Sequence, residues 1–72
     1  MAPKDEFYDA SYRAAQTEAR EWSEDAVCRV IQTWWGRQAS RTPSMASTAA
    51  GIVDGFTDLL RERAAGKARM LR

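Results

Sequence analysis

The sequence of 72 residues contains no histidine and only one cysteine, Cys28. One cysteine cannot form an internal disulfide, and without histidine it cannot make a zinc site of the ordinary type. The commonest general base is therefore missing, and no glycine-rich loop follows a strand pattern. We expect a protein that is not an enzyme and that needs no metal or cofactor.

Long apolar runs are also missing. No run approaches the roughly 20 apolar residues that a membrane-spanning helix needs. The first seven residues, MAPKDEF, lack the charged and then apolar plan of a signal peptide. These absences predict no membrane partner and a cytoplasmic location, in which a lone cysteine stays a thiol.

A chain this short forms one domain, 1–72, with a small core. Such a core rarely contributes more than roughly 3–5 kcal/mol unless something reinforces it. Since a disulfide and a metal are excluded, oligomerisation and close helix packing are left. We therefore expect the chain to bind a second copy of itself as a homodimer.

The first part of the chain has a helical pattern. Apolar residues recur every three or four positions from Tyr8 to Trp34, which predicts one long helix within 4–37. A helix pair is the alternative, because Ser23 followed by two acids is also a suitable helix start. The unbroken apolar stripe favours the single helix.

The second part begins at a clear break. Gly36 can close the first helix, 38–42 forms a turn, and Thr42-Pro43 opens a second helix over 43–65. Gly66 is expected to end it and to leave a basic tail, 66–72. No strand pattern is present. The predicted fold is all-α: an antiparallel hairpin of a long and a shorter helix, or three helices if the chain breaks at Ser23, assembled into a dimeric bundle.

The segment from Trp22 to Trp35 is apolar around more than half of the predicted helix, so we expect it to be covered on two sides. The second helix would cover one side, and a second copy or a foreign protein the other. Tryptophan is a favoured interface anchor, and an acidic ridge beside it could dock on a basic surface. The alternative places the tryptophans in a dimer core and the acids in solvent. The predicted partner-binding residues are Glu18, Glu21, Trp22, Asp25, Trp34 and Trp35. The residues predicted for core or dimer packing are Tyr12, Ala19, Ala26, Val30, Ile31, Ile52, Phe56, Leu59 and Leu60.

Small residues recur at a spacing of four in the second helix, at Ser47, Gly51 and Gly55. Glycine costs roughly 1 kcal/mol inside a helix, so this pattern indicates either close approach of another helix or simple tolerance. Asp54 and Asp58 lie one helical turn apart and are expected to face solvent.

Charge is unevenly spread. Residues 1–25 hold seven acids and three bases, whereas residues 26–72 hold three acids and eight bases. The basic end could contact nucleic-acid phosphates through Arg63, Lys67, Arg69 and Arg72. Cations near the end of a helix also suit its dipole, so a purely structural role is the alternative.

Trp34-Trp35-Gly36 resembles the Trp-x-Gly turn of the small secreted WXG helical hairpins, with Trp34 and Gly36 at the matching positions. The resemblance implies a secreted hairpin. The chain departs from that family because it is shorter and lacks the tyrosine-based export signal expected after the second helix.

The favoured function is a non-enzymatic regulator or inhibitor that acts by direct protein–protein binding. Arginine outnumbers lysine nine to two and alanine is abundant, which is typical of a GC-rich bacterial, phage or plasmid source. We expect a phage- or plasmid-encoded protein directed at a bacterial host protein. A nucleic-acid-associated protein and a WXG-like hairpin are the alternatives.

Overall fold

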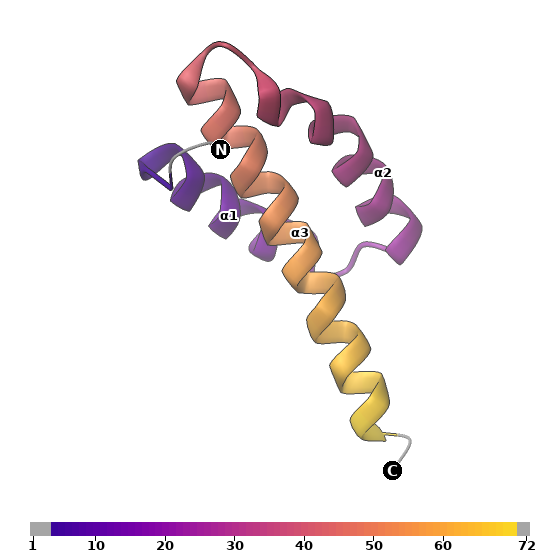
Figure 1. Ribbon diagram of the computed structural model, residues 1–72. Coiled ribbons are helices and arrows are strands. Elements are labelled where there is room, and N and C mark those ends of the chain that lie inside the picture. The colour runs from indigo at the N-terminus through magenta and orange to yellow at the C-terminus, as the bar shows by residue number, and fades with distance from the viewer. Residues whose placement is uncertain (1–3, 71–72) are drawn as a thin grey trace.

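The computed structural model describes residues 4–70, in which every regular element is a helix and no strand occurs. Helix α1 spans Glu6–Glu18, α2 spans Glu24–Trp35 and α3 spans Pro43–Met70, while a short 3₁₀ helix, η1, occupies Gly36–Ala39 (Figure 1). The predicted all-α class is confirmed. The three long helices replace the expected hairpin of two.

The break between α1 and α2 shows that the prediction of one continuous first helix is wrong. Ser23 is extended, and its side chain accepts a hydrogen bond from the backbone N–H of Ala26 at 3.2 Å. Glu24 and Asp25 follow in the first turn, where the helix dipole favours carboxylates. Asp5 caps α1 in the same manner, accepting from the N–H groups of Phe7 and Tyr8. The alternative of a helix pair meeting at Ser23 is therefore confirmed.

Of the two glycines predicted to end helices, Gly36 follows the last residue of α2 as its cap, whereas Gly66 does not end α3. Gly36 has right-handed helical dihedral angles, and the chain continues through it into η1, so only residues 40–42 separate η1 from α3. Gly66 lies inside α3, which continues to Met70. A glycine that ends a helix usually takes a positive φ, and no glycine in the described residues has one. The prediction of a helix end at 65 and a tail from 66 is thus wrong for 66–70, and residues 71–72 lie outside the described range.

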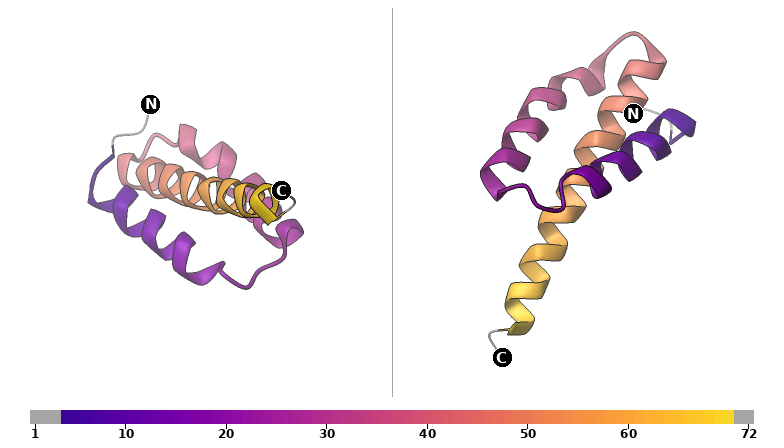
Figure 2. Two further views of the ribbon diagram at one scale, coloured as in Figure 1. Left: turned by 90° about the horizontal axis from the view of Figure 1, so that it is seen from below. Right: turned by 180° about the vertical axis from the view of Figure 1, so that it is seen from behind.

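Helices α1 and α2 both pack on α3, and within the described residues their backbones make no contact with each other. Figure 2 shows them along two sides of α3, while the C-terminal part of α3 projects beyond both. The molecule measures 45 × 20 × 20 Å along its principal axes. The projecting end belongs to α3, because the break at Ser23 turns the chain back and keeps α1 and α2 short.

The core lies where the three helices meet and consists mainly of small side chains. Val27 is the largest apolar side chain that is fully buried. Of the predicted packing residues, Ala19, Phe56 and Leu59 are buried, and the rest are half-buried. The cluster at the centre comprises Ala15, Ala19, Val27, Phe56 and Leu59. Between residues 4 and 70, no helix has the length and apolar character needed to cross a membrane.

Candidate protein-binding groove

The close approach of α1 to α3 sets one side of the site. An added Cβ at Gly51 would lie 2.4 Å from the carbonyl oxygen of Tyr8, and one at Gly55 would lie 2.8 Å from the Cβ of Ala15. Neither position has room for a larger residue, so α1 rests directly on the backbone of α3. Of the two interpretations of the small-residue spacing, close helix approach is the one that the structure shows.

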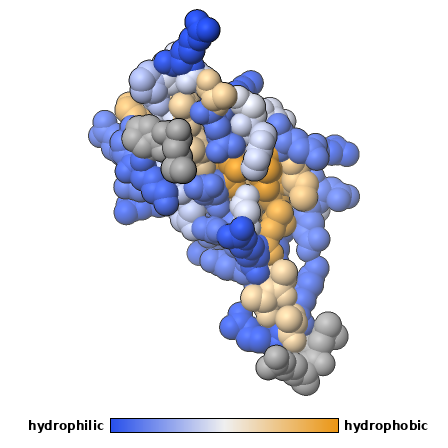
Figure 3. Space-filling view, in the orientation of Figure 1, coloured by the Kyte–Doolittle hydropathy of each residue, from blue (hydrophilic) through white to orange (hydrophobic). Residues whose placement is uncertain are grey.

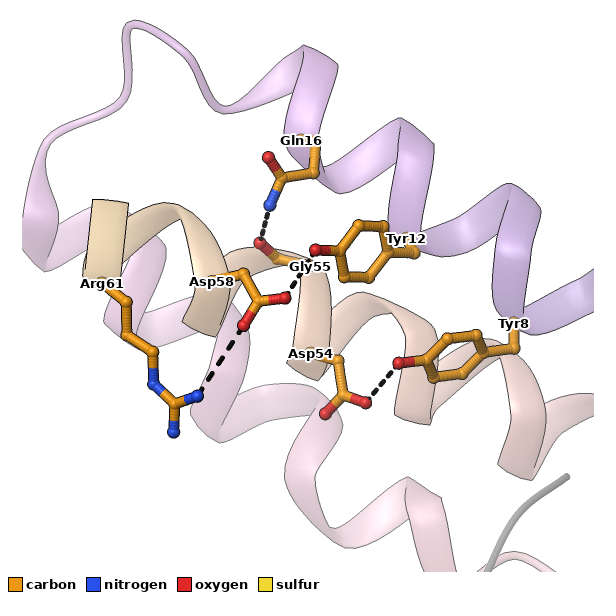
Figure 4. A network of polar contacts seen from close by, with 7 residues as sticks. All are labelled: Tyr8, Tyr12, Gln16, Asp54, Gly55, Asp58 and Arg61. Atoms are coloured by element: carbon orange, nitrogen blue, oxygen red, sulfur yellow. Dashed lines mark hydrogen bonds and ion pairs between the residues drawn. The ribbon is translucent and has the colours of Figure 1, made fainter. Parts of the chain in front are cut away.

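Polar contacts fix the position of α1 along α3 (Figure 4). The hydroxyl groups of Tyr8 and Tyr12 each donate to a carboxylate of α3, Asp54 and Asp58, both at 2.5 Å. Gln16 donates to the backbone oxygen of Gly55 at 2.6 Å. The prediction that both aspartates face solvent is wrong in part, because each is half-buried and accepts a hydrogen bond from a tyrosine. The side chain of Asp58 is still 39% exposed and lies 3.9 Å from the guanidinium of Arg61 (Figure 4).

These contacts change the acidity of both tyrosines. Burial and the hydrogen bond to Asp54 raise the pKa of Tyr8 well above its usual value. The hydrogen bond to Asp58, with burial, raises the pKa of Tyr12. In both cases the neutral phenol is favoured, because a phenolate beside a carboxylate would be repelled and could not donate.

Helix α2 lies farther round α3, so an open apolar groove remains between α1 and α2. It encloses about 400 Å³ and has α3 as its floor. All three helices and the α1–α2 loop contribute side chains, and the lining is almost entirely apolar. The lining residues are Ser11, Ala14, Ala15, Glu18, Trp22, Val30, Trp34, Ile52 and Phe56.

A second hollow extends the groove toward the N-terminus of α3. It encloses about 340 Å³, and Trp34 lines both hollows. The other lining residues are Phe7, Ser40, Thr42, Ser44, Met45 and Thr48. Along α3 the two hollows run from Met45 to Phe56, about 16 Å at 1.5 Å per residue. The combined surface, which we call the groove, therefore spans about three helical turns.

Two tryptophans line this groove, Trp22 from the α1–α2 loop and Trp34 from α2. Trp22 stacks on Phe56 with ring centroids 5.5 Å apart, and 36% of Trp22 is exposed. Trp34 is half-buried, and the guanidinium of Arg37 lies 4.5 Å from its ring centroid. Each ring is held by a neighbour of its own chain and still presents apolar surface to the groove. Such preorganised aromatic side chains are typical anchors of protein interfaces.

Glu18 is the one charged residue that lines either hollow. It is exposed, and within the described residues it has no ion-pair partner. The groove is thus mainly apolar in its first hollow, with serine and threonine hydroxyl groups in the second and one free carboxylate at its edge.

The predicted partner-binding residues separate into two groups. The structure brings Glu18, Trp22 and Trp34 together at the groove. Trp35 is 62% exposed but does not line it, since adjacent residues point about 100° apart on a helix. Glu21, in the loop, and Asp25, in the first turn of α2, are exposed and also do not line it.

Sequence reasoning missed Phe7, Ser11, Ala14 and Met45 as lining residues. Phe7, Ser11, Ala14 and Glu18 are spaced by four, three and four residues along α1. They form a second row beside the apolar stripe that begins at Tyr8. This spacing was a detectable signal, although its mixed polarity makes it weak.

Two of the predicted nucleic-acid contacts instead fasten the loop between α1 and α2 to α3. The guanidinium of Arg63 donates to the carbonyl oxygens of Ala19, Arg20 and Trp22 at 2.8–3.0 Å. Lys67 lies 2.7 Å from a carboxylate oxygen of Glu24, and this contact lowers the pKa of Glu24. Arg69 is exposed in the last turn of α3, and Arg72 lies outside the described residues.

The thiol of Cys28 is free and exposed on α2. Within residues 4–70, no three acidic or cysteine side chains are grouped to hold a metal ion. Comparison with protein-family models, with curated proteins and with solved structures finds no match to this chain. Function must therefore be argued from the groove itself.

Proposed function

We propose that this chain is a non-enzymatic regulator or inhibitor that binds a helical segment of another protein in the groove. The observation that carries the proposal is the separation of α1 from α2, which leaves Trp22, Trp34 and Ile52 beside an open apolar hollow instead of in a closed core. A monomer of this size gains from closing such a hollow, so an unfilled one indicates a surface kept for a partner.

The shape of the groove favours a helix as the bound element. Two helices that flank a third leave the place that a fourth helix occupies in a bundle. An amphipathic helix presents apolar side chains every three or four residues, and about three turns would fill the length from Met45 to Phe56. Because the carboxylate of Glu18 is free, we expect the bound helix to carry a lysine or arginine next to its own apolar face.

The composition that suggests a bacterial, phage or plasmid source supports a bacterial host protein as the target. Nucleic-acid binding has less support, because Arg63 already contacts the loop between α1 and α2, and Lys67 contacts Glu24 in the first turn of α2. The WXG resemblance implies a turn between two long helices at Gly36, whereas the chain continues there into η1.

The test compares three forms of the intact chain as bait in affinity capture from bacterial lysate, quantified by mass spectrometry. Ala14→Glu places a charge in the groove, and Ala65→Glu makes the same change at an exposed site on α3 outside it. A partner held in the groove is recovered by the parent and by Ala65→Glu, and at least about tenfold less by Ala14→Glu, because a buried unpaired carboxylate is costly. Equal recovery by all three forms would refute the proposal. Circular dichroism checks that both variants fold.

A helical peptide from the recovered protein completes the test. The proposal requires that this peptide bind the intact chain, and that replacing its cationic residue by glutamate weaken binding, whereas this loss should be smaller against Glu18→Gln. A partner that binds through a non-helical segment would show the assigned occupant to be wrong.

A further inference from the structure

The projecting part of α3, residues 61–70, has little support from the rest of the chain. Its inward contacts are those of Arg63 and Lys67 with the α1–α2 loop and the first turn of α2. Helical segments of this length are marginal in water unless one face packs against another element. Met70, in the last turn, is 85% exposed.

An apolar stripe runs along this projection and continues onto the body of the molecule. Leu60 is half-buried against the core, and Ala64 and Ala68 follow at a spacing of four on the same face. Ile31 of α2 also packs half-buried against the same core cluster, and Trp35 lies one turn farther along that face of α2. Figure 3 shows an apolar patch over α2 and α3 that continues down the projection. We call this surface, made of Ile31, Trp35, Leu60, Ala64 and Ala68, the seam face. Met70, two residues after Ala68, points about 200° away from Ala68 around the helix and is not part of it.

The exposed area of the chain exceeds that of a compact monomer. A folded monomer of 8.1 kDa is expected to expose about 4,500 Å², whereas this chain exposes 5368 Å². The excess of about 900 Å² is close to the roughly 800 Å² that each partner loses in a stable interface of standard size. The shape is therefore that of a subunit whose projecting helix is covered by a partner.

We infer that a second copy of this chain covers the seam face, with the two α3 helices antiparallel and crossing near Leu60. From Leu60 to Met70 the projection extends about 15 Å, the same distance as from Leu60 back to Ala50. The projection of each copy thus matches the length of the seam on the other copy. A two-fold axis gives both copies the same contacts and closes the assembly at a dimer.

The antiparallel direction places Trp35, which is 62% exposed, against the projecting end of the other copy. Val27 of α2 shares the core cluster with Leu59 of α3, and α2 runs toward the N-terminal end of α3. Trp35, eight residues after Val27, is therefore about level with Gly51 of its own copy. The same region receives Ala68 of the other copy, because Ala68 lies eight residues beyond the crossing at Leu60.

Charge also favours this direction. Residues 61–70 hold four bases, Arg61, Arg63, Lys67 and Arg69, against the single acid Glu62. Parallel pairing would set two such segments side by side, and the repulsion between like charges opposes that arrangement. Antiparallel pairing places the basic segments at opposite ends of the dimer.

Sedimentation equilibrium of the intact chain tests the association, and two matched variants test the surface. Ala64→Glu lies on the seam face, while Ala65→Glu makes the same change at the next, also exposed, residue off the stripe. We expect the parent and Ala65→Glu to dimerise, and Ala64→Glu to raise the dissociation constant at least about a hundredfold, since the two-fold axis buries two unpaired carboxylates. A parent that stays monomeric up to millimolar concentration, or equal effects of both variants, would overturn the inference.

Cross-linking tests the direction. In a Cys28→Ser background, a chain carrying both Trp35→Cys and Ala68→Cys is expected to give a covalent dimer with a short bifunctional maleimide, whereas Ala68→Cys alone is not. Efficient cross-linking by Ala68→Cys alone would show a parallel dimer and overturn the assigned geometry. Because Ala14 lies in the groove and off the seam face, Ala14→Glu should still dimerise, which separates failure of this inference from failure of the proposed function.

Discussion

Replacing Gly51 or Gly66 of α3 by alanine tests how closely α1 packs on α3. Gly51 and Gly66 lie in the same helix, and the same substitution is made at each. Removing a helical glycine stabilises a helix by roughly 0.5–1 kcal/mol where space allows. At Gly66 nothing lies within 4 Å of an added Cβ, so Gly66→Ala should be stabilising by about this amount.

At Gly51 the sign reverses. The added Cβ would lie 2.4 Å from the carbonyl oxygen and 3.1 Å from the carbonyl carbon of Tyr8, both in the rigid backbone of α1. Ordinary contact begins at 3.4 Å, so α1 must move by about 1 Å, the difference between 3.4 and 2.4 Å. Overpacking of this kind costs about 1–3 kcal/mol or more, which exceeds the gain in helix propensity. The net change is a loss of about 1–2 kcal/mol.

Thermal unfolding followed by circular dichroism measures both effects at one protein concentration, because association makes the midpoint depend on concentration. For a domain of this size 1 kcal/mol shifts Tm by about 4–8 °C. Gly66→Ala should therefore raise Tm by about 2–8 °C, and Gly51→Ala should lower it by at least about 4 °C. If Gly51→Ala raised Tm as much as Gly66→Ala does, the close approach of α1 to α3 would be wrong.

Three further predictions concern single side chains. The two tyrosines of the folded chain should ionise above the free tyrosine pKa of about 10, and in guanidinium their pKa should return to that value, as followed by tyrosinate absorbance. Their contribution to stability is full below a pH of about 10 and is lost as pH rises through the folded-state pKa. Ionisation at the free pKa in the native chain would contradict the contacts of Tyr8 and Tyr12. Arg63→Met keeps most of the side-chain stem and removes three hydrogen bonds, which should cost about 1–2 kcal/mol in urea unfolding, and an unchanged midpoint would show that the loop does not depend on them. Ser23→Ala should cost about 1 kcal/mol, whereas Ser44→Ala, in the first turn of α3 after Pro43, should cost less.

The break at Ser23 shows why periodicity alone could not fix the number of helices. The loop of residues 19–23 has a length that keeps the apolar stripe in phase, so Tyr8 to Trp34 reads as one helix although it contains two. The deciding signal was local: a serine cap followed by two acids. A cap contributes about 1 kcal/mol, and here it coincides with a reversal that buries both Ala19 and Val27 completely.

The C-terminal end of α3 shows the opposite case, in which a single local signal predicts the wrong helix end. Gly66 was expected to end the helix, yet its neighbours Ala64, Ala65 and Ala68 are the strongest helix formers. Basic residues in the last turn suit the helix dipole. A single glycine costs roughly 1 kcal/mol in a helix, and this cost does not end a helix whose neighbouring residues all favour it.

The groove was only partly predictable because it depends on a difference in helix spacing. Trp22, Trp34 and Glu18 could be chosen from the sequence as interface residues. That they line the groove together with Ala14 and Met45 follows from two distances, that of α1 from α3 and that of α2 from α3. Glycines let α1 rest on the backbone of α3, whereas Val27, Val30 and Phe56 occupy the space beneath α2. Periodicity gives the face of each helix, but it does not give the distance between their axes.

Different faces of α3 take part in the fold and in both proposed surfaces. A helix that packs against one neighbour needs one apolar face, yet α3 carries small or apolar residues on four. Ser47, Gly51 and Gly55 meet α1, and the buried Ala49 and Val53 lie on the side of α3 away from those residues. Met45, Thr48 and Ile52 form the floor of the groove, and Leu60, Ala64 and Ala68 form the stripe of the seam face. Two of these faces are satisfied within the chain. The other two point in different directions, since Leu60, Ala64 and Ala68 lie about 80°, 120° and 160° from Ile52 around the helix, and they lie at different positions along it. A second copy and a foreign helix could therefore bind at the same time, and a dimer would present two grooves.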